Sequence, residues 1–328
     1  MNKPLVSVIL PNHNYGHFIS EAIQSVLNQS YTNFELWVID DGSTDNSREI
    51  IEKWSVLAPE KVNSVLSEKK GLSFARNKGL SESRGEIIAF LDSDDVWERN
   101  YLSAIVEHFE KNKSSQAVYT NAEVFEAYTN RVLGNWFGPN AKRRCFSGEV
   151  SDKLFVHGNF IPICTAAIRR QVFESAGGFD EKFRLAEDLD FWIRVSMRHP
   201  IDYLDENLCR IRRHSCNASF LYSNAYHVMR VYQKNIQLFP EFTQSINRNT
   251  VNKRWHELYY EIGRHLTLSG KKGTARLFFR KALCYRPDIF TLRFWLYYPL
   301  TYFSYLKQVI RFRLEIVKMR KRLVCAAD

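Results

Sequence analysis

The first 95 residues alternate between short apolar runs and segments in which apolar residues recur at helical spacing. Residues 5–10 and 34–39 are nearly continuous apolar runs, the pattern of strands buried on both faces. Between them, Ile19, Ile23 and Val26 share one face of a helix. The alternation continues with predicted elements at residues 45–57, 62–66, 73–83 and 86–91. This rhythm predicts right-handed βαβ units, and hence an α/β fold with a mostly parallel central sheet and flanking helices.

The middle of the chain has a less regular pattern. Residues 100–219 combine a predicted helix at 101–111, a strand at 117–125 and a helix that starts near Glu187 with turn-rich stretches between them. Because the strand-rich pattern ends in this region, we predict that one α/β domain covers residues 1–220.

The pattern from residue 225 onward is helical. Residues 255–268 and 272–283 resemble one helical hairpin of the tetratricopeptide type. A single copy cannot bury the core of a repeat protein, so no solenoid is predicted. We expect residues 221–328 to form a helical C-terminal region with a basic amphipathic tail.

The net charge of +10 comes from the C-terminal end of the chain. From Lys271 onward there are 14 Lys and Arg against 3 Asp and Glu, whereas the residues before it have a net charge of −1. A basic terminus favours an anionic partner, either a membrane surface or a nucleic acid. Nucleic acid is disfavoured because this region has no recognised binding motif and the rest of the chain is nearly neutral.

The tail predicts peripheral membrane contact rather than a membrane-spanning segment. Residues 290–306 are aromatic-rich but contain Arg293 and Pro299, and the stretch is shorter than the roughly 20 apolar residues a spanning helix needs. One face of the following helix carries four basic residues: Lys307, Arg311, Lys318 and Arg322. This face fits a helix lying on anionic lipid, and it equally fits a helix packed on the domain with a solvated basic face.

The cysteines and the N-terminus favour a reducing, cytoplasmic setting. The six cysteines are scattered without a Cys-x-x-Cys pair, which makes a zinc site unfavourable. The first apolar run is too short for a secretory signal and ends at Pro11. We therefore expect a cytoplasmic protein, located at the inner face of the membrane if the tail binds lipid.

Polar segments follow three of the predicted strands at their carboxyl ends. These segments are residues 11–14, 40–41 and 92–95. Ligands of open α/β sheets bind at the carboxyl ends of the strands, so the three segments are expected to form one site.

The acidic segment predicts a metal-binding site. Asp92, Asp94 and Asp95 repel one another at neutral pH unless a cation neutralises them. Mg²⁺ or Mn²⁺ binds carboxylate oxygens while leaving positions open for the phosphates of a diphosphate. The competing interpretation is an exposed acidic turn in which Asp95 caps the next helix.

Six motifs together resemble the ordered signature of family 2 glycosyltransferases. They are VSVILPNHN at 6–14, DDGSTD at 40–45, GLSFARN at 71–77, LDSDD at 91–95, GGFDE at 177–181 and Glu187-Asp188. The resemblance covers roughly residues 4–220, and the order of the motifs makes it specific although each is weak alone. It implies the GT-A fold and transfer with inversion at the anomeric carbon.

The resemblance also implies roles for residues of the donor site. Pro11, His13 and Asp41 would line the nucleoside pocket, and Arg76 would approach the base or the diphosphate. Asp92 would contact the ribose side of the donor.

The resemblance further implies a metal site and a catalytic base. Asp94 would be the principal ligand of Mn²⁺ or Mg²⁺, assisted by Asp95, with His214 near the metal or the diphosphate. Asp188 would be the base, and Glu187 would raise its pKa or hold the acceptor. The alternative for Glu187-Asp188 is an acid-rich helix N-terminus.

Two other positions have open interpretations. Trp192 lies in an apolar helical segment and is expected in the core rather than at a sugar. Arg212, which precedes Arg213 and His214, would either neutralise phosphate or be a surface charge.

We expect transfer of a single sugar or a few from a nucleotide donor, with UDP favoured by the resemblance, to a glycan or lipid-linked acceptor. Processive family members carry a Gln-x-x-Arg-Trp motif, and residues 251–255 lack the glutamine. A nucleotidyltransferase is the second candidate, although it requires a glycine-rich phosphate loop and residues 11–16 contain one glycine. A non-catalytic sugar- or membrane-binding module is the third, and the intact acidic motifs argue against it.

Overall fold

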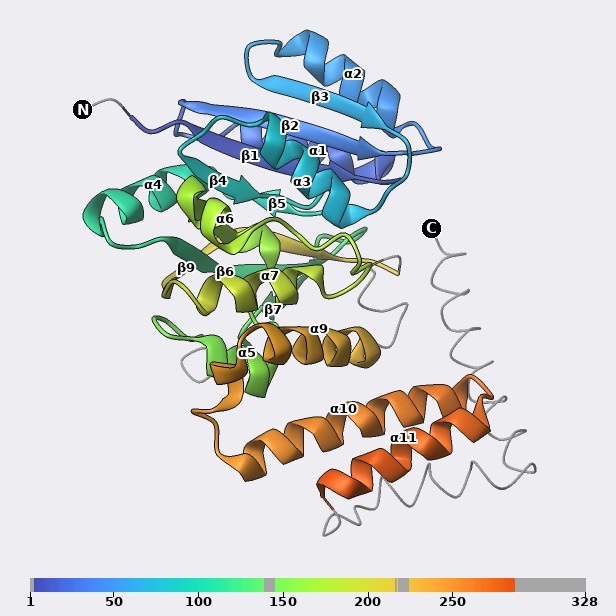
Figure 1. The fold of residues 1–328 in the computed structure, drawn as a ribbon. Helices are drawn as coiled ribbons and strands as arrows, with labels where there is room; N and C mark the ends of the chain where they lie inside the picture. Colours follow the sequence, from blue (N-terminus) through green and yellow to red (C-terminus); the bar gives the residue numbers. More distant parts are fainter. Residues whose placement is uncertain (1–2, 139–144, 216, 218–223, 287–328) are drawn as a thin grey trace. The chain divides into compact units, whose positions relative to one another are not determined.

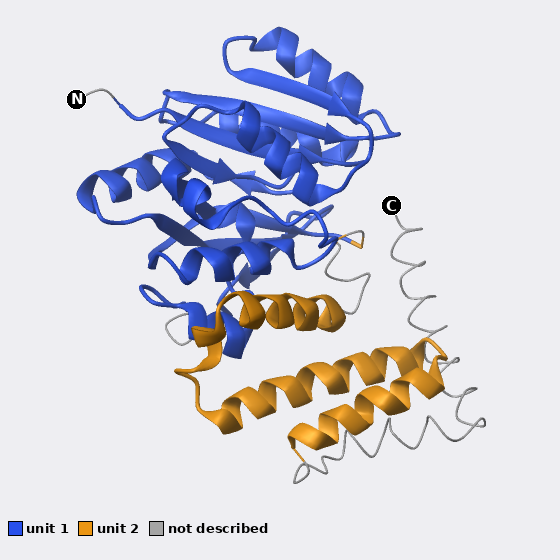
Figure 2. Ribbon diagram, in the orientation of Figure 1, with its two compact units in different colours: residues 1–214 blue, residues 215–328 orange. Residues whose placement is uncertain are grey.

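The computed structural model describes residues 3–138, 145–215, 217 and 224–286. The chain divides into two compact units, residues 1–214 and residues 215–328 (Figure 2). The expected basic amphipathic tail lies outside the described residues.

Strands and helices alternate through the first part of unit 1, as the sequence pattern predicted (Figure 1). The elements are β1 (Val6–Asn12), α1 (Gly16–Leu27), β2 (Phe34–Asp41), α2 (Ser47–Leu57), β3 (Val62–Ser67), α3 (Leu72–Glu82) and β4 (Ile87–Phe90). The strands pair in parallel in the order β3-β2-β1-β4. The carboxyl ends of β2, β1 and β4 are therefore neighbours at one edge of the sheet.

The second part of unit 1 extends this sheet with a mixed set of strands. The elements are β5 (Val96–Trp97), α4 (Tyr101–Lys111), β6 (Ala117–Glu126), β7 (Val132–Asn135), α5 (Ser151–His157), a 3₁₀ helix (Ile163–Thr165), β8 (Ala166–Arg169), α6 (Arg170–Ala176), α7 (Glu187–Ser196) and β9 (Ile201–Arg213). The described residues form a nine-stranded sheet in the order β3-β2-β1-β4-β8-β6-β9-β5, with β7 beside β6. Strand β9 runs parallel to β6, whereas β8 is antiparallel to both of its neighbours.

Helices cover the two faces of the parallel strands with different side chains. On one face, Val8 and Val38 belong to the same buried cluster as Ile23 of α1 and Ile51 of α2. On the other face, α3 approaches so closely that a Cβ at Gly79 would lie 2.6 Å from the Ile9 side chain. Figure 1 shows α3 on the near side of these strands. Alternate residues of each strand therefore pack against helices on opposite faces of the sheet. Because both faces are covered, the strand sequences are continuous apolar runs.

Unit 2 is helical in its described part. It contains α9 (Ala225–Leu238), a 3₁₀ helix (Pro240–Thr243), α10 (Arg248–Leu268) and α11 (Lys272–Tyr285). Helices α10 and α11 form the predicted hairpin, in which Gly263 packs against the Phe279 ring and His256 Nδ1 lies 2.9 Å from the carbonyl of Ala282. Helix α10 starts earlier than the predicted residue 255, because the polar residues of its first two turns hide the apolar pattern.

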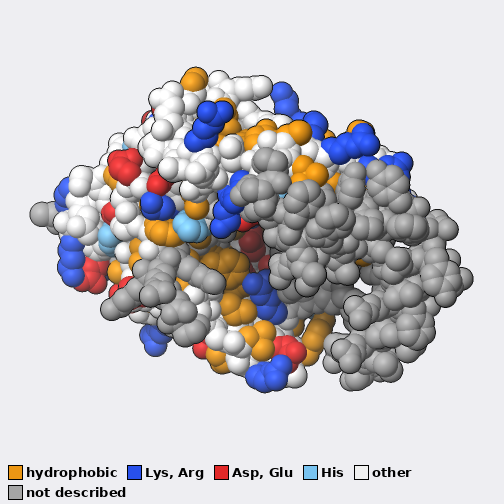
Figure 3. Space-filling model, turned by 90° about the horizontal axis from the view of Figure 1, so that it is seen from below, with side chains coloured by type: hydrophobic (Ala, Val, Ile, Leu, Met, Phe, Trp, Pro, Cys, Tyr) orange, Lys and Arg blue, Asp and Glu red, His pale blue; other side chains and the backbone are white. Residues whose placement is uncertain are grey.

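On the face drawn in Figure 3, Lys and Arg side chains of the described residues lie among neutral and apolar ones. Among the described helices, none combines the length and the apolar character that crossing a membrane requires.

Candidate active site

The loop after β1 is fixed to the loop after β2 by buried polar side chains. Asn12 Nδ2 donates to Asp40 Oδ1 at 3.0 Å and to Ser43 Oγ at 3.1 Å. The backbone N–H of Asn14, whose φ is +58°, donates to Ser43 Oγ at 2.9 Å. Asp45 accepts from the first N–H of α1 at Gly16 and from Ser47 in the first turn of α2, so one carboxylate orients both helix starts.

Asp41 and His13, both predicted to line a nucleoside pocket, lie against the loop between β3 and α3. The Asp41 carboxylate accepts from the backbone N–H groups of Lys70 and Gly71 at 2.6 and 2.8 Å. His13 Nε2 lies 2.7 Å from Lys69 Nζ, while its buried Nδ1 has no hydrogen-bond partner. A buried ring nitrogen without a hydrogen-bond partner is unusual in a folded protein, and its place at the end of a parallel strand makes it a candidate for contact with a ligand.

Arg76 connects two segments of the site rather than projecting into open space. Its guanidinium donates to Asp92 Oδ1 at 2.8 Å and to Glu187 Oε1 at 2.7 Å, and the side chain is 2% exposed. Burial alone would lower the pKa of Arg76, but the charges of Asp92, Glu187 and Asp188 outweigh burial and raise that pKa. Arg76 is therefore the cation that holds the Asp92 turn and the start of α7 together.

The acidic residues that follow β4 have three different surroundings. Asp92 faces Arg76, Asp94 Oδ2 lies 2.9 Å from His214 Nε2, and Asp95 Oδ1 accepts from the backbone N–H of Arg212 at 2.9 Å. Burial, opposed by Arg76 and reinforced by Asp94, raises the pKa of Asp92. Burial and the charges of Asp94 and Asp92 raise the pKa of Asp95 well above its usual value. Such a cluster gains stability from an added cation.

His214 brings the end of β9 to the acidic turn. Its ring is packed by aromatic neighbours, with the centroid of Tyr15 at 5.5 Å and that of Phe18 at 5.0 Å. Asp94 and His214 are separated by 120 residues, yet their side chains are adjacent, with His214 buried and Asp94 partly buried. The Asp94 carboxylate and the His214 imidazole can therefore act on one ligand.

Glu187 and Asp188 begin α7 directly after a strained residue. Ala186 has a φ of +61°, which is unfavourable for a residue with a Cβ and is concentrated at functional sites. Glu187 is engaged by Arg76, whereas Asp188 Oδ2 accepts from Asn159 Nδ2 at 2.6 Å. Burial, and then the charge of Glu187, raise the pKa of Asp188 to about 7.

This raised pKa gives a pH-dependence prediction. If Asp188 acts as a base, the reaction requires its ionised form, so kcat/KM should rise with pH to a plateau above pH 7. The measurement is kcat/KM from about pH 5 to pH 9 at saturating metal. Full activity already at pH 5 would contradict the assignment of Asp188 as the base, because it would indicate a base with the usual pKa of a carboxylate.

The sequence did not predict a role for three residues of this region, Asn77, Asn159 and Arg194. Asn159 follows Gly158 in an irregular stretch and has no motif around it. Asn77 and Arg194 hold the turn at residues 177–179: Asn77 Nδ2 donates to the Phe179 carbonyl at 2.8 Å, and Arg194 donates to the Gly178 carbonyl at 2.6 Å. Asn77 lay inside a recognised motif, which was the one available signal.

Trp192 has no exposed surface, as expected of a core residue. Arg212 is buried and engaged by protein groups, so it is not the surface charge that one interpretation allowed.

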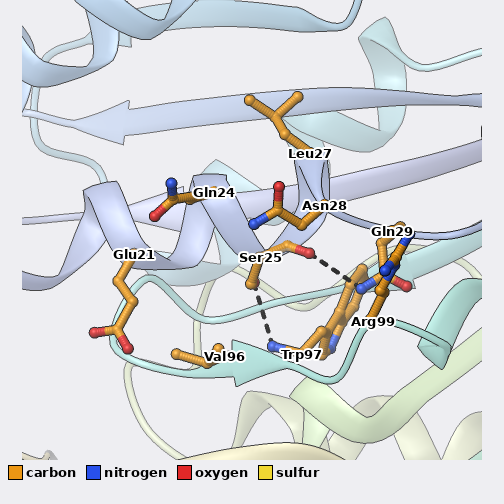
Figure 4. A pocket seen from close by; sticks show the side chains of 9 residues that line it. All are labelled: Glu21, Gln24, Ser25, Leu27, Asn28, Gln29, Val96, Trp97 and Arg99. Atoms are coloured by element: carbon orange, nitrogen blue, oxygen red, sulfur yellow. Dashed lines mark hydrogen bonds between the residues drawn. The ribbon is translucent and has the colours of Figure 1, made fainter.

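A separate groove of about 720 Å³ lies between α1 and β5 (Figure 4). None of the predicted site residues lines it. Its lining residues are Glu21, Gln24, Ser25, Leu27, Asn28, Gln29, Val96, Trp97 and Arg99. In this groove the backbone N–H of Trp97 donates to Ser25 Oγ at 3.2 Å, as Figure 4 shows.

Comparison with known proteins identifies the family. The model of glycosyl transferase family 2 matches residues 7–177, which is more than half of the chain. The chain therefore belongs to glycosyl transferase family 2, and the enzyme class that the motifs indicated, a glycosyltransferase, is confirmed.

Curated relatives agree with this family. An uncharacterized glycosyltransferase of Nostoc is 33% identical over 217 residues, which is 65% of this chain and 66% of the relative. An Escherichia coli protein, "UDP-Glc:alpha-D-GlcNAc-diphosphoundecaprenol beta-1,3-glucosyltransferase WfgD", is 39% identical over 140 residues, which is 42% of this chain and 53% of the relative. The chain thus spans about half to two thirds of these relatives' lengths.

Solved structures share the fold. Staphylococcus aureus TarS (residues 1–349) in complex with UDP has a TM-score of 0.54 at 18% identity, covering 85% of this chain and 88% of that TarS fragment. A mannosyltransferase of Pyrobaculum calidifontis in complex with GDP-Man and Mn²⁺ has a TM-score of 0.60 at 18% identity, covering 94% and 86%. These similarities confirm the predicted GT-A type of α/β fold.

Proposed function

We propose that the protein is an inverting, metal-assisted glycosyltransferase that moves one sugar from a nucleotide-diphosphate donor to a glycan or lipid-linked acceptor. One observation carries the proposal: Arg76 links the Asp92 turn, which also bears the Asp94–His214 pair, to the start of α7, which bears Asp188. Leaving-group stabilisation and acceptor activation are the two tasks of such a transfer, and each segment has residues suited to one of them.

Asp94 and His214 are the residues that would hold a divalent cation. Their ligand atoms lie 2.9 Å apart; the carboxylate suits Mn²⁺ or Mg²⁺, and the imidazole favours Mn²⁺ over the harder Mg²⁺. No set of three or more His, Cys, Asp or Glu side chains is grouped for metal binding in the part of the chain described. The donor's diphosphate would therefore complete the coordination, and Asp95, whose carboxylate is engaged by Arg212, would support the turn. When bound, the cation would neutralise charge on the departing diphosphate.

Asp188 is proposed as the base. In the transfer, the acceptor hydroxyl oxygen forms a bond to the anomeric carbon while the bond from that carbon to the diphosphate oxygen breaks. The hydroxyl proton passes to the Asp188 carboxylate, and the electron pair of the broken bond leaves with the diphosphate. A base with a pKa of about 7 is matched to this step at neutral pH.

The donor's nucleoside is proposed to bind at the ends of β1 and β2. The unpartnered Nδ1 of His13 and the buried Asp41 are polar groups at this edge, and Pro11 is a buried residue of β1 beside them. Asp92 would contact the ribose side. Because Arg76 is enclosed between two carboxylates, we assign it to positioning these groups rather than to reading the base.

The substrate class is proposed from the named relatives and the missing processive motif. The E. coli relative is named for a UDP-glucose donor and a diphosphoundecaprenol-linked acceptor, and a Bacillus subtilis relative is a putative teichuronic acid biosynthesis glycosyltransferase. We propose a UDP-sugar donor and a role in bacterial surface polysaccharide synthesis, with the protein at the inner face of the cytoplasmic membrane.

The direct test is a screen of UDP- and GDP-sugars for transfer or hydrolysis with Mn²⁺, with Mg²⁺ and with EDTA. The expected result is release of a nucleoside diphosphate that EDTA abolishes. Release of pyrophosphate would instead support a nucleotidyltransferase. Transfer that persists in EDTA would contradict the metal assignment.

Among the three acids of the turn, replacement of Asp94 by alanine is expected to lower activity most. It removes the ligand that faces His214, and we expect a loss of about a hundredfold in kcat/KM. The matched comparisons are Asp92→Ala and Asp95→Ala, assayed at the same Mn²⁺ concentration. A larger loss at Asp92 would reverse the order.

A further inference from the structure

Arg212 lies behind the acidic turn with its charge enclosed by protein. The residue is 3% exposed, and its guanidinium carbon is 4.6 Å from the ring centroids of both Phe18 and Phe125. A buried guanidinium packed against two rings has little freedom to rotate. Arg212 therefore has a fixed orientation that a solvated arginine lacks.

Arg212 donates two hydrogen bonds to the turn that carries Asp94 and Asp95. Its backbone N–H donates to Asp95 Oδ1 at 2.9 Å, and its Nε donates to the backbone carbonyl of Asp94 at 2.8 Å. Two residues further along the chain, His214 lies 2.9 Å from the Asp94 carboxylate. Residues 212–214 thus fix both the main chain and the side chain of Asp94.

The terminal NH2 group of the Arg212 guanidinium is bound by a residue of helix α1. This group donates to Glu21 Oε2 of α1 at 2.6 Å. Glu21 is half exposed and lines the groove of Figure 4, and among the contacts of the described residues it is Arg212 that connects it to the acidic turn. Its substitution therefore changes the support of the turn without touching the donor site.

We propose that Arg212 is a positioning residue that presents the Asp94 carboxylate to the metal–diphosphate, and that Glu21 is the anchor that keeps it in place. This inference rests on the proposed metal-assisted function. Groups that orient metal ligands typically change metal affinity by ten- to a hundredfold. Loss of the hydrogen bonds that the Arg212 guanidinium makes should therefore weaken Mn²⁺ binding more than it weakens nucleotide binding.

The chain provides a matched control on the same strand. Arg210 lies 2.9 Å from Glu123 and 4.4 Å from the Phe125 ring centroid, and none of its described contacts is with the acidic turn. The test compares R212K and E21Q with R210K and E123Q. Binding of Mn²⁺ in the presence of UDP is titrated by the loss of the free-ion EPR signal, UDP binding without metal is measured by calorimetry, and Tm is recorded for each variant.

We expect R212K to raise the Kd for Mn²⁺ about tenfold and E21Q to raise it about threefold, with UDP affinity in the absence of metal unchanged. R210K and E123Q should bind Mn²⁺ as the wild type does. Because Glu21 is half exposed, E21Q should keep the wild-type Tm within about 2 °C, which separates positioning from a general loss of stability.

Equal Mn²⁺ affinity in the wild type, R212K and E21Q would overturn the proposal. So would a matching loss of UDP affinity without metal in R212K, since that result indicates a direct phosphate contact. A wild-type protein that binds no Mn²⁺ with UDP or GDP would overturn the metal-assisted function itself, and this inference with it. The wild-type titration thus distinguishes the two failures.

Discussion

Replacement of Asp188 by asparagine is expected to lower sugar transfer about a thousandfold while leaving donor binding intact. General base catalysis contributes on the order of 10²–10⁴ in rate, and the amide cannot take the acceptor's proton. The Asp188 side chain contacts Asn159 and the start of its own helix, so the substitution leaves the Arg76 links untouched. The measurements are kcat for transfer and Kd for the donor.

The fold of this variant can be checked by the pH dependence of its stability. The pKa of Asp188 is raised from 3.8 to about 7 in the folded state. Ionisation of this group therefore lowers the free energy of unfolding of the wild-type protein as pH rises between these values. Asp188→Asn should therefore be more stable relative to wild type at pH 8 than at pH 4. Asp205→Asn, at an exposed carboxylate, serves as the control. Wild-type turnover in Asp188→Asn would reject Asp188 as the catalytic base.

Replacement of Arg76 by alanine is expected to destabilise the protein by about 3–5 kcal/mol and to lower activity more than a hundredfold. The change leaves the buried Glu187 carboxylate and the partly exposed Asp92 carboxylate without their shared cation. It also releases the segment bearing Asp94 from the segment bearing Asp188. The measurements are urea unfolding at several pH values and kcat at a temperature where the variant is folded.

The sign of the pH effect tests the physical cause. Without the cation, the two carboxylates should hold their protons to higher pH in the folded state, so the stability deficit should grow between about pH 4 and pH 8. Arg84→Ala is the control, because Arg84 is largely exposed and lies 3.4 Å from Glu35. A deficit that is independent of pH would show that Arg76 acts through packing alone.

The sequence alone determined the α/β class, the positions of the strands and the strand-end location of the polar segments. Strands buried on both faces produce apolar runs that can be read locally, as at residues 5–10 and 34–39. It also identified the family through six ordered motifs. Pattern did not predict the antiparallel strand β8, because Ala166–Arg169 is four residues long and too short to show a period.

Only the tertiary structure decided which groups meet. Arg76 contacts Asp92, 16 residues away, and Glu187, 111 residues away, and no local spacing encodes the second contact. The separate surroundings of Asp94 and Asp95 likewise depend on β9, which brings Arg212 and His214 behind the turn. The sequence could list the charged residues, but their roles depend on burial and on long-range partners. Those are set when helices and distant strands pack.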